Sequence, residues 1–242
     1  YRLPRAVVAA CCGAGLAVSG VILQSLLRNA LADPYLLGIS AGASTGAVLV
    51  TVAGVGAGAI SLSLGAFGGA LCAFLLVALL ARASGGGVGP RAAGQIVLAG
   101  IAGSQLFNAL TAFIITRSAS AEQARGIMFW LLGNLSGARW DNVGMAVPVA
   151  LGVTLLCLWH ARALDAFTFG TDSATALGVP VRRVQTLLIG CASLATAVMV
   201  SIVGSIGFVG LVVPHAARFI VGVRHVRLVP VAALMGAIFL IA

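Results

Sequence analysis

Few side chains of this sequence could take part in chemistry, and their types and spacing match no catalytic or metal-binding pattern. The chain has 242 residues, with five acids, three histidines and no lysine. The acids are Asp33, Glu122, Asp141, Asp165 and Asp172, and the histidines are His160, His215 and His225. All of them lie near the ends of apolar stretches or between stretches. We therefore expect no catalytic cluster, no metal and no cofactor, and the missing lysine excludes a Walker-type phosphate loop.

The composition is that of a protein that lies in a membrane. Hydrophobic residues make up 61% of the chain, charged residues only 8%, and the mean hydropathy is +1.14. A soluble domain carries about 25% charged residues. Here the apolar residues recur in stretches near the roughly 20 residues that cross a bilayer as a helix. The sequence predicts an all-α, polytopic membrane protein in which residues 1–242 form one transmembrane domain.

Eight apolar stretches are candidates for membrane-spanning helices. They are Val7–Leu27, Gly38–Val55, Ile60–Ala81, Ala92–Ile115, Val143–Trp159, Val181–Val203, Ile206–Val221 and a last one that starts at Val226. The glycine-rich loop Arg82–Arg91 separates two of them, and Gly126–Leu135 is too short to cross. Gly207, Gly210 and Pro214 interrupt the seventh, which predicts a kinked or half helix. Both ends of the chain look cut, so we expect further spans beyond them.

Alternate loops differ in their content of arginine. The richer set holds Arg28; Arg82 and Arg91; His160, Arg162, Arg182 and Arg183; and Arg218, Arg224, His225 and Arg227. The poorer set holds Arg2 and Arg5; Arg117, Glu122 and Arg125; and Arg139 and Asp141. The positive-inside rule places the richer set in the cytoplasm and Arg2 and Arg5 outside. The net charge of +9 therefore reflects membrane orientation and not a nucleic-acid partner.

The scarcity of ionisable groups at membrane depth argues against an ion-coupled transporter, which usually places carboxylates there. A path that is powered from elsewhere needs a cytoplasmic contact with its power source. The segment Leu164–Gly178 is the candidate, because Thr171 or Asp172 could cap a short helix and Gly178 suits a left-handed end. Leu164 and Phe167, three residues apart, could share one face of a preceding turn. An ordinary interfacial loop helix is the alternative.

Two long blocks carry a resemblance to a known family. They are RLPRAVVAACCGAGLAVSGVILQSLLRNALADPYLLGISAGASTGAVL (Arg2–Leu49) and GSIGFVGLVVPHAARFIVG (Gly204–Gly222), the latter followed by HVRLVP (His225–Pro230). They resemble the permeases of ABC importers for ferric siderophores, haem and vitamin B12. The resemblance implies ten spans in the whole subunit, with this chain running from the second into the ninth. It also implies a homodimer in the bacterial inner membrane, two ATP-binding cassette subunits and a periplasmic binding protein.

The resemblance also implies roles for particular residues. Arg2 and Arg5 match arginines that meet the binding protein, and Asn29 and Leu31 match a cytoplasmic gate. Ala93 and Gly94 match a second gate region, although they are small and apolar where the vitamin B12 permease is polar. The residues expected to couple to the ATPase are Leu164, Phe167, Gly170, Asp172, Ala174, Leu177 and Gly178.

These expectations combine into a function. The chain is expected to be a non-catalytic permease that moves an iron chelate inward by alternating access, while ATP is hydrolysed by partner subunits. Haem is the expected cargo, because a bulky and largely apolar ligand suits a path with few polar groups. A ferric siderophore or vitamin B12 remains open within the same family. The rival functions are an ATP-independent secondary transporter or channel, and a membrane enzyme.

Overall fold

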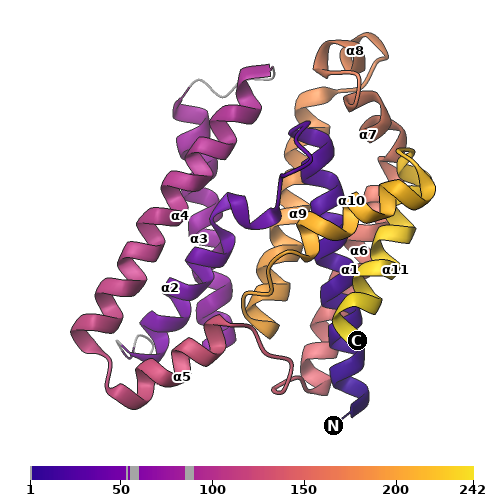
Figure 1. Ribbon diagram of the computed structural model, residues 1–242. Coiled ribbons are helices and arrows are strands. Elements are labelled where there is room, and N and C mark those ends of the chain that lie inside the picture. Colours follow the sequence, from indigo (N-terminus) through magenta and orange to yellow (C-terminus); the bar gives the residue numbers. More distant parts are fainter. Residues whose placement is uncertain (1, 53, 55–59, 85–89) are drawn as a thin grey trace.

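The computed structural model describes the whole chain except residues 1, 53, 55–59 and 85–89, so the predicted break at 85–87 lies outside the described residues. The described part is helical and contains no β-strand (Figure 1). Its helices are α1 (Arg2–Leu26), η1 (Pro34–Leu37), α2 (Ile39–Thr51), α3 (Leu62–Ala83), α4 (Pro90–Ser118), α5 (Ala121–Leu131), α6 (Trp140–Trp159), α7 (Ala161–Phe167), α8 (Thr171–Ala176), α9 (Val181–Val203), α10 (Val209–Val221) and α11 (His225–Ile241). The predicted all-α membrane fold is confirmed.

Within the described residues, five helices are long and apolar enough to cross a membrane, namely α1, α3, α4, α6 and α9. The helices α2 and α10 have 13 residues each, which at 1.5 Å per residue is about 20 Å and shorter than the bilayer core. Each begins after an irregular segment: η1 and the left-handed Gly38 precede α2, and residues 204–208 precede α10. The prediction of a half helix in the seventh stretch is therefore confirmed.

Pro214 lies inside α10, and the helix continues past it to Val221. A proline inside a helix leaves the carbonyl four residues earlier without its usual N–H donor. That carbonyl belongs to Gly210, and the side-chain amide of Gln24 on α1 donates to it at 3.2 Å and to the carbonyl of Leu211 at 3.2 Å. The side chain of a neighbouring helix thus replaces the missing backbone donor.

The helices form two groups, with α2 to α5 in one and α1 and α6 to α11 in the other (Figure 1). α1 lies at the centre of the second group: 72% of its most apolar window is buried, against 22% for α6. Its side chains enter all three of the larger apolar clusters, through Ile22, Leu23 and Leu16 respectively. α9 joins the groups because it packs against both α3 and α1.

Glycines set the separation of α2 and α3. A methyl group built on Gly46 would lie 2.1 Å from the carbonyl oxygen of Gly65, and one on Gly69 would lie 2.1 Å from the carbonyl oxygen of Gly42. Both obstacles are backbone atoms, which cannot turn aside as a side chain does. The two GxxxG faces, Gly42 with Gly46 and Gly65 with Gly69, therefore allow a helix-to-helix approach that no other residue would permit.

The two sets of loops that differ in arginine content lie at opposite ends of the molecule (Figure 1). The end of α3, the beginning of α4, the α7–α8 pair and the α10–α11 connection share one end. The N-terminus of α1, α5 and the beginning of α6 share the other. The alternation predicted from the apolar stretches is thus reproduced by the direction of each helix.

Candidate functional site

The α7–α8 pair is built by backbone geometry at two glycines. Gly170 joins the helices with φ +106°, and Gly178 ends α8 with φ +81°, values that favour glycine because a Cβ is strained there. The N–H of Gly178 donates to the carbonyl of Thr175 at 2.9 Å, and the N–H of Val179 donates to that of Ala174 at 3.0 Å. This pair of bonds is a Schellman motif, as the position of Gly178 predicted.

The beginning of α8 differs from the expectation. Neither Thr171 nor Asp172 caps the helix, because the capping position is occupied by Gly170, which has no side chain to accept a bond. Thr171 is the first helical residue, and Asp172 lies in the first turn. A carboxylate in that turn still interacts favourably with the positive end of the helix dipole.

Burial divides the seven residues expected to couple to the ATPase. Leu164 and Phe167 are 0% and 2% exposed, and Ala174 and Gly170 are also buried. They pack inside this chain, so they offer no exposed side chain to a partner. They position the pair instead, because Leu164 and Phe167 lie in the same apolar cluster as Ile22 of α1.

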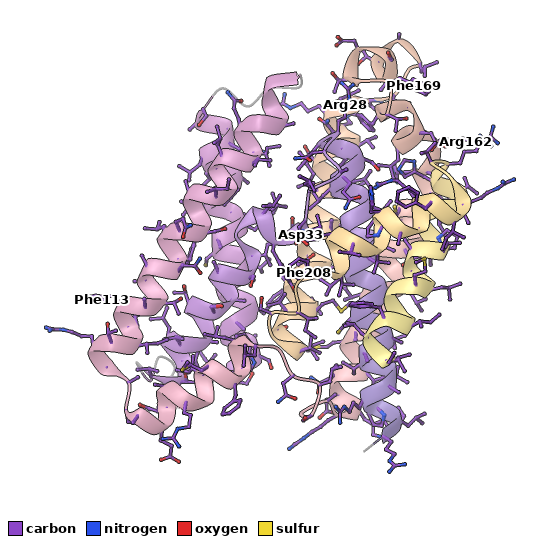
Figure 2. The ribbon with its side chains drawn as sticks, viewed as in Figure 1. Arg28, Asp33, Phe113, Arg162, Phe169 and Phe208 are labelled. Carbon is purple, nitrogen blue, oxygen red and sulfur yellow. The ribbon has the colours of Figure 1, made fainter. Side chains whose placement is uncertain are left out.

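Of these seven residues, the exposed ones are Asp172, Leu177 and Gly178. Leu177 is 71% exposed, and Phe169, which the sequence analysis did not single out, is 77% exposed. Figure 2 shows Phe169 on the α7–α8 pair, near that end of the molecule. Two large apolar side chains on such a projecting segment are typical of a surface that another protein covers. Phe169 could have been found from its position directly before the glycine that joins the two helices.

Arg28 links the end of α1 to this pair. It has a left-handed backbone with φ +49°, so the chain turns sharply two residues after α1 ends. Its guanidinium lies beside the junction of α7 and α8, since a methyl group on Gly170 would be 3.5 Å from Nη1. The segment that follows, Asn29 to Leu31, is exposed, and the side chain of Asn29 accepts the N–H of Leu31 at 2.9 Å.

An open cavity of about 430 Å³ lies beside that segment. Leu31 and Asp33 line it from the α1–η1 linker, Ser104 and Gln105 from α4, and Phe208 and Leu211 from the beginning of α10. Figure 2 shows Asp33 and Phe208 in the middle of the molecule. Phe208 has φ +66°, an unusual backbone for a bulky residue. The cavity combines an apolar wall with a few polar groups, as sites for organic ligands do.

The four gate candidates are not all gathered at this cavity. Leu31 lines it and is 72% exposed, whereas Asn29, Ala93 and Gly94 are not among its lining residues. Ala93 is half-buried near the beginning of α4, and Gly94 has no atom within 4 Å of a methyl group built on it. The sequence analysis missed Gln105 and Phe208, because nothing in their neighbourhood marks them as lining a shared space.

Arg2 and Arg5 are exposed in the first turns of α1. That helix runs through the molecule, so they lie at the end opposite the α7–α8 pair (Figure 1). Among the described residues, no group of three or more histidine, cysteine, aspartate or glutamate side chains could hold a metal ion.

Known proteins share this chain's sequence and fold. The family described as the FecCD transport family matches residues 1–242. The cobalamin import system permease protein BtuC of Halobacterium salinarum is 43% identical over 242 residues, which are 100% of this chain and 63% of that protein. The hemin transport system permease protein HmuU of Yersinia pestis is 37% identical over 244 residues, 99% of this chain and 71% of that protein. A solved structure described as an inward-facing conformation of a metal-chelate type ABC transporter has a TM-score of 0.87 and 32% identity, covering 99% of this chain and 74% of that chain. The chain therefore spans less than three quarters of the length of each of these relatives.

Proposed function

Because the chain belongs to the FecCD transport family, we propose that it forms most of the permease subunit of an ATP-driven importer of metal chelates. The observation that carries this proposal is the α7–α8 pair. It projects from one end of the bundle, exposes Phe169 and Leu177, and is anchored by Leu164 and Phe167 to the central helix α1. A projecting helix pair that exposes apolar side chains and is anchored to the central helix suits a partner protein that binds it and moves it. ATP-binding cassette subunits are the expected partner, and the subunit itself catalyses nothing.

The test is reconstitution of the full-length subunit with its ATPase and binding protein in proteoliposomes. Uptake of cargo is expected only when ATP is present on the side of the membrane that carries the ATPase and the binding protein is present on the opposite side. Uptake without ATP would overturn the proposal in favour of a secondary transporter or channel. Absence of uptake together with absence of stimulated ATP hydrolysis, in a complex that assembles, would also contradict it.

Haem is the cargo that the path was expected to suit, and cobalamin is a second candidate. The 43% identity to a protein described as a cobalamin import permease favours cobalamin. The cavity wall does not decide between haem and cobalamin. The argument for haem assumed a path with few polar groups, but Asp33, Ser104 and Gln105 line the cavity. Uptake of haem, cobalamin and a ferric siderophore in the same vesicles decides among them, since only the transported chelate should stimulate ATP hydrolysis through the binding protein.

We propose that the subunit lies in the cytoplasmic membrane. The α7–α8 pair then faces the cytoplasm, and Arg2 and Arg5 face the binding protein. Their charge reversal to glutamate is expected to lower the association rate of the binding protein about tenfold at low salt, because charges at an interface rim act mainly on association. Stimulated ATP hydrolysis should fall in parallel, while basal hydrolysis stays unchanged. The difference should shrink at high salt, where such charges are screened. An undiminished association rate at low salt would remove these residues from the docking surface.

We propose further that two copies of this chain meet so that Leu31 and Asn29 form a steric gate at the cavity. Leucine is bulky enough to exclude water, and its 72% exposure in the single chain leaves it available to a second copy. A cysteine at 31 is expected to cross-link between subunits in one nucleotide state and to separate in another. The exposed native Cys72 is first replaced by serine, and a cysteine at the similarly exposed Leu155 of α6 is the control. Failure to cross-link at 29 and at 31 in every state, with normal transport, would place the gate elsewhere.

A further inference from the structure

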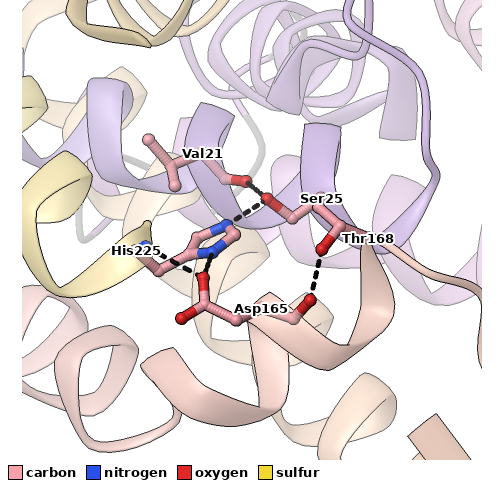
Figure 3. A network of polar contacts seen from close by, with 5 residues as sticks. All are labelled: Val21, Ser25, Asp165, Thr168 and His225. Carbon is pink, nitrogen blue, oxygen red and sulfur yellow. Dashed lines mark hydrogen bonds and ion pairs between the residues drawn. The ribbon is translucent and has the colours of Figure 1, made fainter. Parts of the chain in front are cut away.

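A hydrogen-bonded chain with a buried histidine at its centre and a partly exposed aspartate at one end connects α7 to the end of α1 through the first residue of α11 (Figure 3). His225 is 1% exposed, and its ring lies between Asp165 of α7 and Ser25 of α1. Nδ1 is 2.6 Å from Asp165 Oδ1, and Nε2 is 2.6 Å from Ser25 Oγ. The three residues are separated by 60 and 200 positions in the sequence, so only the fold brings them together.

The hydrogen positions follow from the chemistry of the partners. A carboxylate only accepts, so Nδ1 carries a proton and donates to Asp165. Nε2 accepts from the Ser25 hydroxyl when the ring is neutral and donates to it when the ring is protonated; in the second case the hydroxyl proton goes to the carbonyl of Val21, 2.7 Å away. Asp165 Oδ1 also accepts the backbone N–H of His225 at 3.0 Å. The carboxylate thereby caps α11, whose own preceding residue, Arg224, provides no side-chain cap.

The cap does not account for Ser25. Capping α11 requires only the bond from the backbone of His225 to Asp165, and the imidazole could have been any residue for that purpose. The further bond from the ring to Ser25 adds nothing to that cap. It ties His225 of α11, and through the ring Asp165 of α7, to the last turn of α1. Apolar contacts between the two helices are non-directional, whereas two short hydrogen bonds through one rigid ring fix both distance and direction.

The end of α1 in turn adjoins both walls of the cavity. Leu31 follows Ser25 by six residues, after the turn at Arg28. Gln24, next to Ser25, donates to the carbonyls of Gly210 and Leu211 and accepts from Arg218 at 2.5 Å, so it holds α10, whose first turn supplies Phe208 and Leu211 to the cavity. One short stretch of α1 therefore bonds to His225, and through it to α7, on one side, and to a cavity-lining helix on the other.

We propose that Asp165, His225 and Ser25 form the linkage that transmits movement of the α7–α8 pair to the α1 end and the cavity. This proposal rests on the proposed function, because it assumes a partner that moves the pair. The three side chains are positioning residues, because none of them lines the cavity.

Ser25→Ala is the variant that cuts the linkage with the least damage. It keeps the cap of α11 and the bond between His225 and Asp165, and alanine is a better helix former than serine. The matched control is Ser19→Ala on the same helix, which is equally buried and donates to the carbonyl of Ala192 on α9 at 3.3 Å. Ser25→Thr retains the hydroxyl and is the conservative variant expected to restore the wild-type result.

The first readout is the number of ATP molecules hydrolysed per chelate imported by the reconstituted complex. Ser25→Ala is expected to raise it about tenfold, the order of effect expected from leaving one buried hydrogen-bonding group without its partner. Ser19→Ala and Ser25→Thr should stay within about twofold of the wild type. A variant that merely destabilised the subunit would lower import and stimulated hydrolysis together and leave the ratio unchanged. An unchanged ratio for Ser25→Ala, or an equal rise for Ser19→Ala, would overturn the linkage.

The second readout does not depend on transport. Backbone hydrogen exchange in the purified full-length subunit is expected to become faster in Ser25→Ala at both Arg28–Leu31 and Ala161–Phe167, and at neither in Ser19→Ala. Faster exchange at only one of the two segments would show that they are not joined through Ser25. A wild-type complex that fails to import would contradict the proposed function alone, because the exchange result still decides whether the linkage exists.

Discussion

Replacing Leu177 by aspartate is expected to abolish ATP-driven import while the subunit still folds. Leu177 directly follows the last residue of α8 and is 71% exposed, so the change disturbs little inside the chain. At a covered interface it removes an apolar contact of about 1.5–3 kcal/mol and forces an unpaired carboxylate out of water at a further cost of several kcal/mol. Together these amount to a loss of at least about a hundredfold in ATPase affinity or in coupled transport.

The measurement is copurification of the ATPase with the subunit, followed by import in proteoliposomes. Leu177→Met is the control, because it conserves volume and apolar character and should transport normally. Loss of the ATPase and hydrolysis without import would both support the assignment of this surface. Wild-type import by a Leu177→Asp complex that assembles would refute it.

Adding one methyl group at Gly46 is expected to disrupt the packing of α2 on α3. The new Cβ of Gly46→Ala would lie 2.1 Å from the carbonyl oxygen of Gly65 and 2.9 Å from its carbonyl carbon. Because both atoms belong to the backbone, one helix must move, and overpacking of this kind costs about 1–3 kcal/mol or more. The short helix α2 also carries Thr45, which bonds to Thr111 of α4 at 2.8 Å, so a shift would spread to a second interface.

Gly68→Ala on α3 is the matched control. It lies one residue from Gly69, but a methyl group there meets no atom within 4 Å. It should gain up to about 1 kcal/mol from helix propensity, so the same substitution is expected to have opposite signs at the two positions. The measurement is the temperature at which the detergent-solubilised subunit loses its monodisperse state. Equal behaviour of the two variants would mean that α2 and α3 are not held at this distance.

The membrane-spanning helices could be predicted because their signal is local. An apolar stretch with a length near 20 residues predicts a membrane-spanning helix without further information. α3, α6 and α9 lie close to the expected ranges. The signal for the end of α8 is equally local, since Gly178 and Pro180 follow the helix within four residues. The beginning of α8 was not predicted. Its capping position is occupied by Gly170, which has no side chain that could be recognised as a cap and acts through its backbone conformation.

The parts of the site that escaped prediction depend on partners far away in the sequence. Leu164 and Phe167 had the spacing of an apolar helix face, but spacing does not say whether this chain or another protein covers that face. The cavity brings together Leu31, Gln105 and Phe208 from three separate elements. His225 was interpreted as a residue at a span boundary, and its bonds to Asp165 and Ser25 required the packing of α1, α7 and α11 to be known.

The central position of α1 has a consequence for the synthesis of the protein. Its buried polar side chains Ser19, Gln24 and Ser25 find their partners 173, 186 and 200 residues later in the chain. At a translation rate of about 5–20 residues per second, α1 waits roughly 10–40 seconds for α9, α10 and α11 to leave the ribosome. Until then these groups can only make provisional bonds in the bilayer. Packing around α1 is thus completed only when the last helices, α9 to α11, have been made. In a nascent chain that stops before α9, the polar groups of α1 stay without these partners, and such groups are a feature by which an unfinished membrane protein can be recognised and degraded.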